Sequence, residues 1–287
     1  MMRLFRSTKG RKPLLTIKLY KRHVIAFIIF VIVGFIGYGM YFRAFMTLPQ
    51  SAINLVEEIP VDLNNQKVLI ISPHCDDEVL GSGGLVVRAL KSNSEVRVVM
   101  VTDCNKRKIG ETRRQETITG MKTFGVEADK IKFLNFPEGE ESSRKSESEK
   151  KEMYQALRKE ISEYSPTVVI LPHPKDTHID HRASGEAGLR VLKEQKNIKA
   201  LFYLVHYNFL KFPAPPGFHP EVNILPPARL ISFNERWYKF SLSAEEEDLK
   251  EESVLKYKSQ LRRSNPVLQR ILLEFVRKNE LFMIEGK

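Results

Sequence analysis

The sequence predicts an α/β fold, a Rossmann-like and mostly parallel β-sheet flanked by helices, preceded by one N-terminal transmembrane helix. Three observations support this prediction. From residue 67 onward, short runs of β-branched residues alternate with helical patterns, as in βαβ units that cover both faces of a parallel sheet. A long run without charged residues lies near the N-terminus. Clusters of acids and histidines directly follow two of the predicted strands.

The uncharged run, Val24–Phe42, is the first predicted element. Its 19 residues are close to the roughly 20 that a helix needs to cross a bilayer, and the run has no polar face. A cleaved signal peptide would have a shorter apolar region followed by small residues at a cleavage site. The end of this run and the residues after it read YFRAFMTLP, which contains no convincing cleavage site of small residues. We therefore expect an uncleaved anchor.

Basic residues are concentrated before this anchor. The first 23 residues contain eight lysines and arginines and no acid, and removing these eight charges from the net charge of +11 leaves +3. A nucleic-acid-binding protein would carry its excess positive charge on the folded domain, so we expect no nucleic-acid partner. The positive-inside rule places the N-terminus in the cytosol and everything after Phe42 on the exoplasmic side of the cell membrane.

The chain is therefore expected to contain a basic cytosolic tail (1–23), a transmembrane anchor (24–42), a stalk or linker (43–65) and one folded domain (66–287). Strands are predicted in that domain at Val68–Ser72, Glu95–Thr102, Lys132–Leu134, Thr167–Leu171 and Ala200–Val205. Helices are predicted through Leu85, Val86 and Leu90, over about Glu111–Phe124, through Met153, Leu157 and Ile161, and over Ala183–Leu192.

The last third of the chain is less regular. It contains a proline-rich loop (212–220), an acidic run (Glu245–Asp248) that we expect to be a solvated face, and helical patterns over Glu251–Leu261 and Val267–Lys278. The two cysteines, Cys75 and Cys104, each follow a predicted strand. An exported location would permit a disulfide between them, but two cysteines do not make a framework, and we expect two separate thiols.

The segment PHCDDEVLGSGGL (residues 73–85) follows the first predicted strand. Ligands of open α/β sheets bind at the carboxyl ends of the strands. Neighbouring carboxylates repel one another unless a cation neutralises them, and histidine and aspartate are ordinary zinc ligands. The order G-x-G-x-x-G is absent, and the acids would repel a pyrophosphate, so a dinucleotide site is disfavoured. A solvated acidic turn is the alternative for this segment taken alone.

The segment DTHIDHRA (residues 176–183) follows the fourth predicted strand. The fold thus carries His178, Asp180 and His181 to the same rim of the sheet as His74. Catalytic zinc sites have three protein ligands and one open position, and the two clusters together supply such a set. Two imidazoles and one carboxylate also suit iron or manganese, so the residues leave the identity of the metal open.

Together these segments resemble the signatures of the PIG-L/LmbE family of N-acetylglucosaminyl de-N-acetylases. PHCDDEVLGSGGL is similar to the family's P-H-P-D-D-E-x-x-G-x-G-G, with Cys75 at the usual proline, and DTHIDHRA contains its H-x-D-H-x-A. Supporting matches are RRQE (113–116), FPEG (136–139), Lys250 with YKSQ (257–260), and RKNELF (277–282). The resemblance covers about residues 66 to 284.

The resemblance implies a zinc-dependent hydrolase that releases acetate from an N-acetylated amino sugar. The implied Zn2+ ligands are His74, Asp77 and His181, the implied catalytic residues are Asp76, His178 and Asp180, and the implied substrate-binding residues are Arg113 and Glu138. Asp76 would act as the general base on the zinc water, and His178 would polarise or protonate the tetrahedral intermediate. Asp180 would orient a neighbouring histidine.

Other functions remain open to this sequence. A membrane-tethered sugar-binding module without activity would need no base beside its metal, and the presence of Asp76 disfavours it. A metal-dependent phosphoesterase would want a second set of ligands or more basic residues at the site. A cytosol-facing deacetylase of a thiol precursor or a lipid is the alternative to an enzyme that acts on a cell-surface glycan. His206 is expected to line the pocket or to pack, and Trp237 to stack on a sugar or belong to the core.

Overall fold

The computed structural model describes residues 20–46, 48–139, 145–195, 197–207, 212–213, 223–232, 235–262 and 272–285. The chain divides into two compact units, Met1–Thr47 and Leu48–Lys287. The first unit contains the helix α1 (Lys21–Met46). Within it, Lys21–Tyr41 is long and apolar enough to cross a membrane, and none of this stretch is buried. The helix includes the predicted anchor and extends beyond it at both ends.

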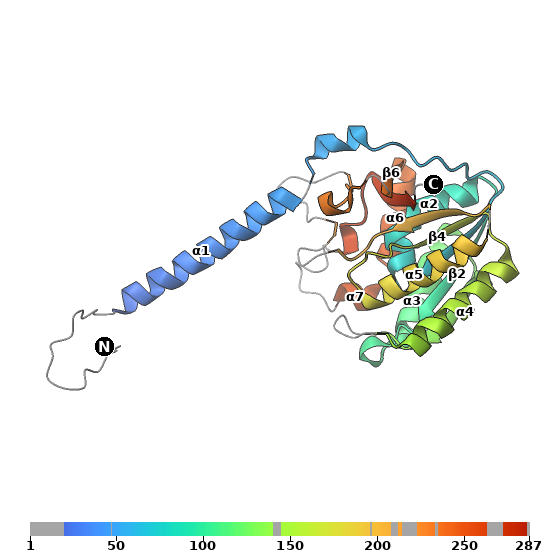
Figure 1. Ribbon diagram of the computed structural model, residues 1–287, viewed down its shortest axis with the longest axis horizontal. Helices are drawn as coiled ribbons and strands as arrows, with labels where there is room; N and C mark the ends of the chain where they lie inside the picture. The colour runs from blue at the N-terminus through green and yellow to red at the C-terminus, as the bar shows by residue number, and fades with distance from the viewer. Residues whose placement is uncertain are drawn as a thin grey trace. The chain divides into compact units, whose positions relative to one another are not determined.

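The second unit is built on a seven-stranded sheet with the order β3-β2-β1-β4-β5-β7-β6 (Figure 1). The strands are β1 (Lys67–Ser72), β2 (Glu95–Thr102), β3 (Ile131–Phe136), β4 (Val168–Pro172), β5 (Lys199–Tyr203), β6 (Glu235–Ser241) and β7 (Asn279–Glu285). The first five are parallel, and β7 pairs antiparallel with both β5 and β6. The predicted mostly parallel sheet is therefore confirmed.

The helices of the second unit cover both faces of the sheet (Figure 1). They are α2 (Asp77–Lys91), α3 (Gly110–Phe124), α4 (Glu147–Tyr164), α5 (Ile179–Glu194), α6 (Ala244–Val254) and α7 (Lys258–Arg262). The helices α4 and α5 pack against each other, whereas α2 and α3 pack together with α6. Local signals set their ends: α4 starts with a capping box between Ser146 and Glu149, and α3 stops at Gly125, which has a left-handed φ of 97°.

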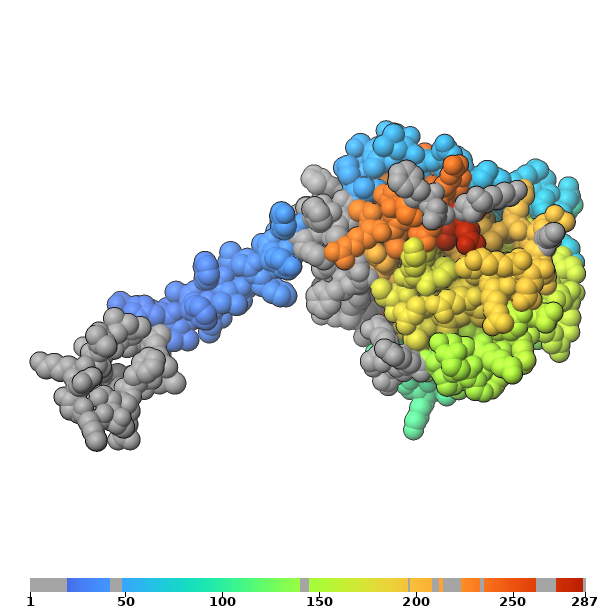
Figure 2. Space-filling model, viewed as in Figure 1, coloured from blue at the N-terminus to red at the C-terminus, as the bar shows by residue number. Residues whose placement is uncertain are grey.

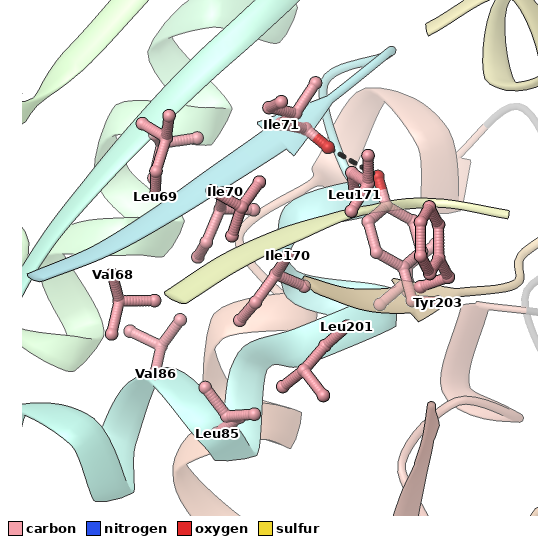
Figure 3. Packing of buried hydrophobic residues seen from close by; sticks show 14 of the residues in the cluster. Val68, Leu69, Ile70, Ile71, Leu85, Val86, Ile170, Leu171, Leu201 and Tyr203 are labelled. Carbon is pink, nitrogen blue, oxygen red and sulfur yellow. Dashed lines mark hydrogen bonds between the residues drawn. The ribbon is translucent and has the colours of Figure 1, made fainter. Parts of the chain in front are cut away.

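The core lies where β1, β4 and β5 meet α2 (Figure 3). Apolar residues on β1 and β4 are fully buried, including Ile70 and Ile170, and each such side chain contributes about 1.5–3 kcal/mol of stability. The hydroxyl of Tyr203 donates to the carbonyl oxygen of Ile71 at 3.0 Å. A Cβ atom on Gly81 would lie 2.5 Å from the Tyr203 ring. The first turns of α2 are therefore packed directly against the central strands.

The strands β6 and β7 were not predicted. Charged residues on β7 and next to it are buried and paired. Glu280 on β7 is buried and accepts hydrogen bonds from the amides of Gly84 (2.7 Å) and Leu85 (2.9 Å). Lys250 of α6 is buried beside it, with its Nζ atom 2.7 Å from the Glu280 carboxylate. This buried ion pair ties β7 and α6 to the glycine-rich turn of α2.

Other expectations for the last third of the chain were wrong. Glu246, within the acidic run, is buried and pairs with Arg88, so the run is not simply a solvated face. The helix expected over Glu251–Leu261 is interrupted between α6 and α7. Residues 267–271 of the pattern Val267–Lys278 and residues 214–220 of the loop 212–220 lie outside the described residues.

Residues 48–65, within the segment expected to be a linker, pack on the folded unit. The amide of Ile59 donates to the carbonyl oxygen of Lys239 at 2.9 Å, and the Lys239 amide donates to that of Glu57 at 2.8 Å. Figure 2 shows this early segment, in blue, beside the orange residues of the last third of the chain. The unit thus begins with a strand-like addition next to β6.

Close packing of α5 predicts the effect of one substitution. A Cβ atom on Gly185 would lie 2.5 Å from the carbonyl oxygen of Pro172, so Gly185→Ala must displace α5 from the end of β4. We expect the free energy of unfolding to fall by about 1–3 kcal/mol, measured by denaturant unfolding. The control Glu186→Ala, at the exposed next position, should change it by less than about 0.5 kcal/mol. Equal stability of the two variants would contradict this packing.

Candidate metal centre and active site

Both predicted clusters lie at the carboxyl ends of adjacent parallel strands. The loop with His74 follows β1 and the loop with His178 follows β4, and these two strands are hydrogen-bonded neighbours. The chain runs from β1 outward to β3 and then returns to β4 on the other side of β1. This reversal of strand order is the switch point at which open α/β sheets bind their ligands.

Three side-chain atoms converge at this point. The Nδ1 atom of His74 lies 3.1 Å from the Nε2 atom of His181, and the Oδ2 atom of Asp77 lies 3.3 Å from the first and 2.9 Å from the second. All three residues are buried. Ligand atoms of a tetrahedral zinc ion at ~2.0–2.2 Å would stand roughly 3.3–3.6 Å apart. The donor set therefore suits a small divalent cation in its chemistry, and two of its three separations are a few tenths of an ångström shorter than in such a complex.

Each histidine is oriented by a second carboxylate. The Nε2 atom of His74 lies 2.9 Å from Asp180 Oδ2, and the Nδ1 atom of His181 lies 3.2 Å from Asp176 Oδ2. A ring nitrogen that donates its proton to a carboxylate leaves the other nitrogen free to bind a metal. Asp180 and Asp176 thus hold the two rings so that their other nitrogen atoms, Nδ1 of His74 and Nε2 of His181, lie next to Asp77.

Asp176 and Lys145 belong to the site although the sequence analysis assigned them no role. Asp176 is fully buried and accepts hydrogen bonds from the amides of His178 (2.8 Å) and His206 (2.9 Å). Lys145 is buried with its Nζ atom 2.9 Å from Asp180 Oδ1. Asp176 is part of the DTHIDHRA segment and could have been found there, whereas no local pattern marks Lys145.

The charges at this cluster favour ionised side chains. Burial alone would lower the pKa of His74, but the hydrogen bonds with Asp180 and Asp77 raise it to about 9. Burial alone would raise the pKa of Asp77, yet the charges and hydrogen bonds of His181 and His74 hold it well below its usual value. Protons and a metal ion therefore compete for the same ring nitrogens, and either one neutralises the buried carboxylate.

Asp76 stands beside this cluster and faces the pocket. It precedes α2 with an unusual φ of 141°, and it lines the pocket, whereas Asp77 does not. Burial raises the pKa of Asp76 to about 8, against the opposing effect of the Arg113 charge, whose NH2 atom lies 3.9 Å away. A carboxylate with such a pKa can accept and return a proton near neutral pH.

His178 also lines the pocket and lies beside His74, with ring centroids 4.5 Å apart. Its Nδ1 atom accepts a hydrogen bond from the Asp180 amide at 3.3 Å, which leaves the proton on Nε2. Burial and the charges of His74 and His181 lower the pKa of His178 to about 3. A neutral imidazole with its proton on Nε2 can donate a hydrogen bond to a developing oxyanion. Of the two expected roles, polarising the intermediate is favoured over protonating it.

Arg113 and Glu138 form one buried unit at the pocket wall. The NH1 atom of Arg113 donates to both carboxylate oxygens of Glu138, at 3.2 and 3.0 Å, and its NH2 atom donates to the carbonyl oxygen of Cys75 at 3.1 Å. Glu138 also accepts from the Lys106 amide at 2.9 Å. The pair therefore joins the loops after β1, β2 and β3 around the pocket.

Three further aromatic side chains have defined places. His206 lines the pocket, one of its two expected places. Its ring centroid is 4.7 Å from that of His181, and it offers a nitrogen atom within the same donor group as His74 and Asp77, so it is also a candidate ligand, a role that the sequence analysis did not predict. His173 stacks on Trp237 with centroids 5.3 Å apart. The indole nitrogen of Trp237 donates to Leu230 at 3.0 Å, which favours a core role for this tryptophan.

Cys75 and Cys104 form a disulfide, so the expectation of two separate thiols was wrong. They follow β1 and β2, which are neighbouring parallel strands, and their Cα atoms are 5.8 Å apart, within the range of disulfides. Because the sulfur atom of Cys75 is part of this bond, Cys75 has no free thiolate that could bind the metal. The bond also ties the metal-binding loop to the loop that begins at Cys104.

The pocket at this site has a volume of about 220 Å³. Its lining residues are His74, Asp76, Lys106, Arg107, Ile109, Arg113, Glu138, His178, His206 and Gln260. The structure thus brings together all eight residues expected from the sequence. Six lie in or next to the candidate metal-binding group of side chains, and Arg113 and Glu138 lie in the pocket wall.

The contact between Asp176 and His181 predicts the effect of removing one charge. Asp176→Asn should lower the affinity for a divalent metal about 10- to 100-fold, because the neutral amide holds the His181 ring less firmly. Competition with a chromogenic chelator measures this affinity. The control Asp129→Asn removes an equal charge from an exposed position and should leave the affinity unchanged. Equal affinities of wild type and Asp176→Asn would exclude the orienting role.

Comparison with known proteins agrees with this geometry. Residues 69–192 match the family model PIG-L, described as GlcNAc-PI de-N-acetylase. Diacetylchitobiose deacetylase of Thermococcus kodakarensis is 26% identical over 175 residues, which cover 53% of this chain and 61% of that relative. The chain thus matches less than two thirds of the length of this relative.

Two solved structures share the fold. A deacetylase of the teicoplanin biosynthesis pathway superposes with a TM-score of 0.57 at 19% identity, over 77% of this chain and 99% of the other. N,N'-diacetylchitobiose deacetylase of Pyrococcus horikoshii superposes with a TM-score of 0.50 at 22% identity, over 84% and 94%. Both signature segments lie at one rim of this fold, within the residues 69–192 that match the PIG-L family model.

Proposed function

We propose that this protein is a metal-dependent deacetylase that hydrolyses the N-acetyl group of a substrate containing N-acetylglucosamine and releases acetate. The observation that carries this proposal is the convergence of His74, His181 and Asp77 next to Asp76 at the end of a pocket. The relatives named as deacetylases support the reaction class. The proposed metal is zinc, which accepts two imidazoles and one carboxylate and leaves a position open.

Amide hydrolysis needs a nucleophile at neutral pH, a polarised carbonyl group and a proton for the departing amine. A zinc ion, when bound, supplies Lewis acidity and lowers the pKa of its water to about 7. Asp76 takes the proton of the attacking water at its carboxylate and passes it to the departing nitrogen. Its raised pKa, about 8, suits both halves of this transfer.

The remaining residues stabilise and position the reacting groups. His178 donates a hydrogen bond from Nε2 to the oxygen of the acetyl carbonyl as negative charge develops there. Arg113 and Glu138 hold the pocket wall and present polar atoms to the hydroxyl groups of the sugar. Asp180 and Asp176 keep the ligand rings oriented. In this proposal the deacetylated product is a free amino sugar.

We propose that the catalytic unit lies on the exoplasmic side of the cell membrane, attached by α1. The eight basic residues before the anchor support this orientation. The disulfide between Cys75 and Cys104 supports it independently, because disulfides persist in oxidising compartments and are rare in the cytosol. An exoplasmic enzyme would act on a cell-surface glycan or glycolipid.

Substitutions of the adjacent residues Asp76 and Asp77 distinguish proton transfer from metal binding. Asp76→Asn should lower the rate of acetate release about 10²- to 10⁴-fold while the metal content stays at the wild-type value. Asp77→Asn should lose both metal and activity. Acetate is measured with a panel of N-acetylated sugars, and metal by elemental analysis. Unchanged turnover of Asp76→Asn would refute its assignment as the base, and no acetate from any sugar with wild-type protein would refute the proposed activity.

The orientation can be measured with two reporters fused to the C-terminus. A reporter that is active only outside the cytosol should work, and one that is active only in the cytosol should not, because the positive tail stays inside. A control in which Lys18, Lys21 and Arg22 become glutamate weakens the charge bias and should reduce the exoplasmic fraction. Activity of the cytosolic reporter on the wild-type chain would reverse the assignment.

A further inference from the structure

Three consecutive basic residues lie at the mouth of the pocket. Lys106, Arg107 and Lys108 form a short turn after β2, and all three side chains are exposed. Lys106 and Arg107 line the same pocket as His74 and Asp76, whereas Lys108 does not. Within the described part of the chain, no acidic side chain forms an ion pair with any of the three. The mouth of the pocket therefore carries positive charge that the protein itself leaves unneutralised.

The acids nearest to this turn do not cancel its charge. The carboxylate of Glu138 accepts from the Lys106 amide, but its charge is matched by the Arg113 guanidinium at 3.0 Å. Asp103 accepts hydrogen bonds from the amides of Asn105 and Glu138. Glu111 accepts from the side chain of Gln115. The carboxylates thus face backbone amides or other partners, and the ammonium and guanidinium groups face the pocket and the solvent.

The pocket is too small to hold a large substrate. Its volume of about 220 Å³ is below the roughly 300–1,000 Å³ of sites that enclose a drug-sized ligand. One sugar ring fills such a space with its acetyl group at the metal end. A group attached to that sugar extends out of the pocket, and Lys106 and Arg107 are the exposed residues of its lining.

We infer that Lys106 and Arg107 form an anion subsite, which selects substrates whose acetylated sugar carries a phosphate group next to the ring. This inference rests on the proposed deacetylase function and narrows its substrate class. An arginine and a lysine together suit a phosphate, because the guanidinium can bind two of its oxygens and the ammonium adds a point charge. The disulfide at Cys104 holds the start of this turn beside the metal loop.

The subsite can be tested with isosteric neutral variants of the full-length protein. The variants are Lys106→Gln, Arg107→Gln and the matched control Lys108→Gln, which removes the same charge from the same turn outside the pocket. The neutral substrate is the methyl glycoside of N-acetylglucosamine. The anionic substrates are N-acetylglucosamine 1-phosphate and the same sugar joined to a lipid by a phosphodiester, in detergent micelles.

The wild-type protein should deacetylate both anionic substrates with a higher kcat/KM than the neutral one. Lys106→Gln and Arg107→Gln should each lower kcat/KM for the anionic substrates about tenfold, mainly through KM, because each removes one positive charge next to the bound phosphate. The loss of kcat/KM on the neutral substrate should be smaller, because that substrate lacks the phosphate group with which these side chains pair. A preference for the lipid substrate alone would assign the selectivity to the lipid and overturn the inference.

Two further outcomes would also overturn it. Equal losses in Lys108→Gln would show a general attraction of anions, and equal losses on the neutral substrate would show a structural role of the turn. Calorimetric binding of N-acetylglucosamine 1-phosphate to the Asp76→Asn protein separates this inference from the proposed reaction. If no sugar yields acetate but this phosphate binds about tenfold more weakly once Lys106→Gln is added, the reaction is wrong and the subsite stands.

Discussion

The whole site depends on the cost of burying several charges at one point. Asp77, Asp176 and Asp180 are almost fully buried together with His74 and His181, and isolated charges in such a place would be strongly unfavourable. The arrangement is stable because every carboxylate faces a ring nitrogen, a backbone amide or Lys145. A divalent cation completes the same balance. This requirement explains why the loops after β1 and β4 meet so closely, and why helix α5 must approach the end of β4 without a side chain at Gly185.

The sequence was sufficient for the parallel half of the sheet and for most of the site. Continuous apolar strands alternating with amphipathic helices predicted β1 to β5 because both faces of a parallel sheet are covered. Two motifs placed His74 and His181 on one rim because adjacent parallel strands end at the same edge. The carboxylate that orients His181, Asp176, lies within a predicted motif. Its role depends on the direction of a side chain, which spacing alone does not specify.

Long-range partners account for what the sequence did not predict. Glu246 of α6 and Glu280 of β7 have their partners in α2, the side chain of Arg88 and the amide of Gly84, more than 150 positions away. Lys145 is buried because it pairs with Asp180, whereas the Lys-Ser-Glu pattern taken alone indicates an exposed segment. To predict the disulfide, one would have to know that β1 and β2 are neighbouring strands in register. In each case local propensity was outweighed by a contact that the fold creates.

The buried pair of Lys250 and Glu280 has a consequence for how the protein is made. Glu280 accepts the amides of Gly84 and Leu85, so the first helix of the catalytic unit is completed by the last strand. During synthesis, a nascent chain that has not yet delivered this strand lacks the acceptor for that turn and has an unformed rim. The rim that carries the candidate metal ligands is therefore completed only after Glu280 has been synthesised.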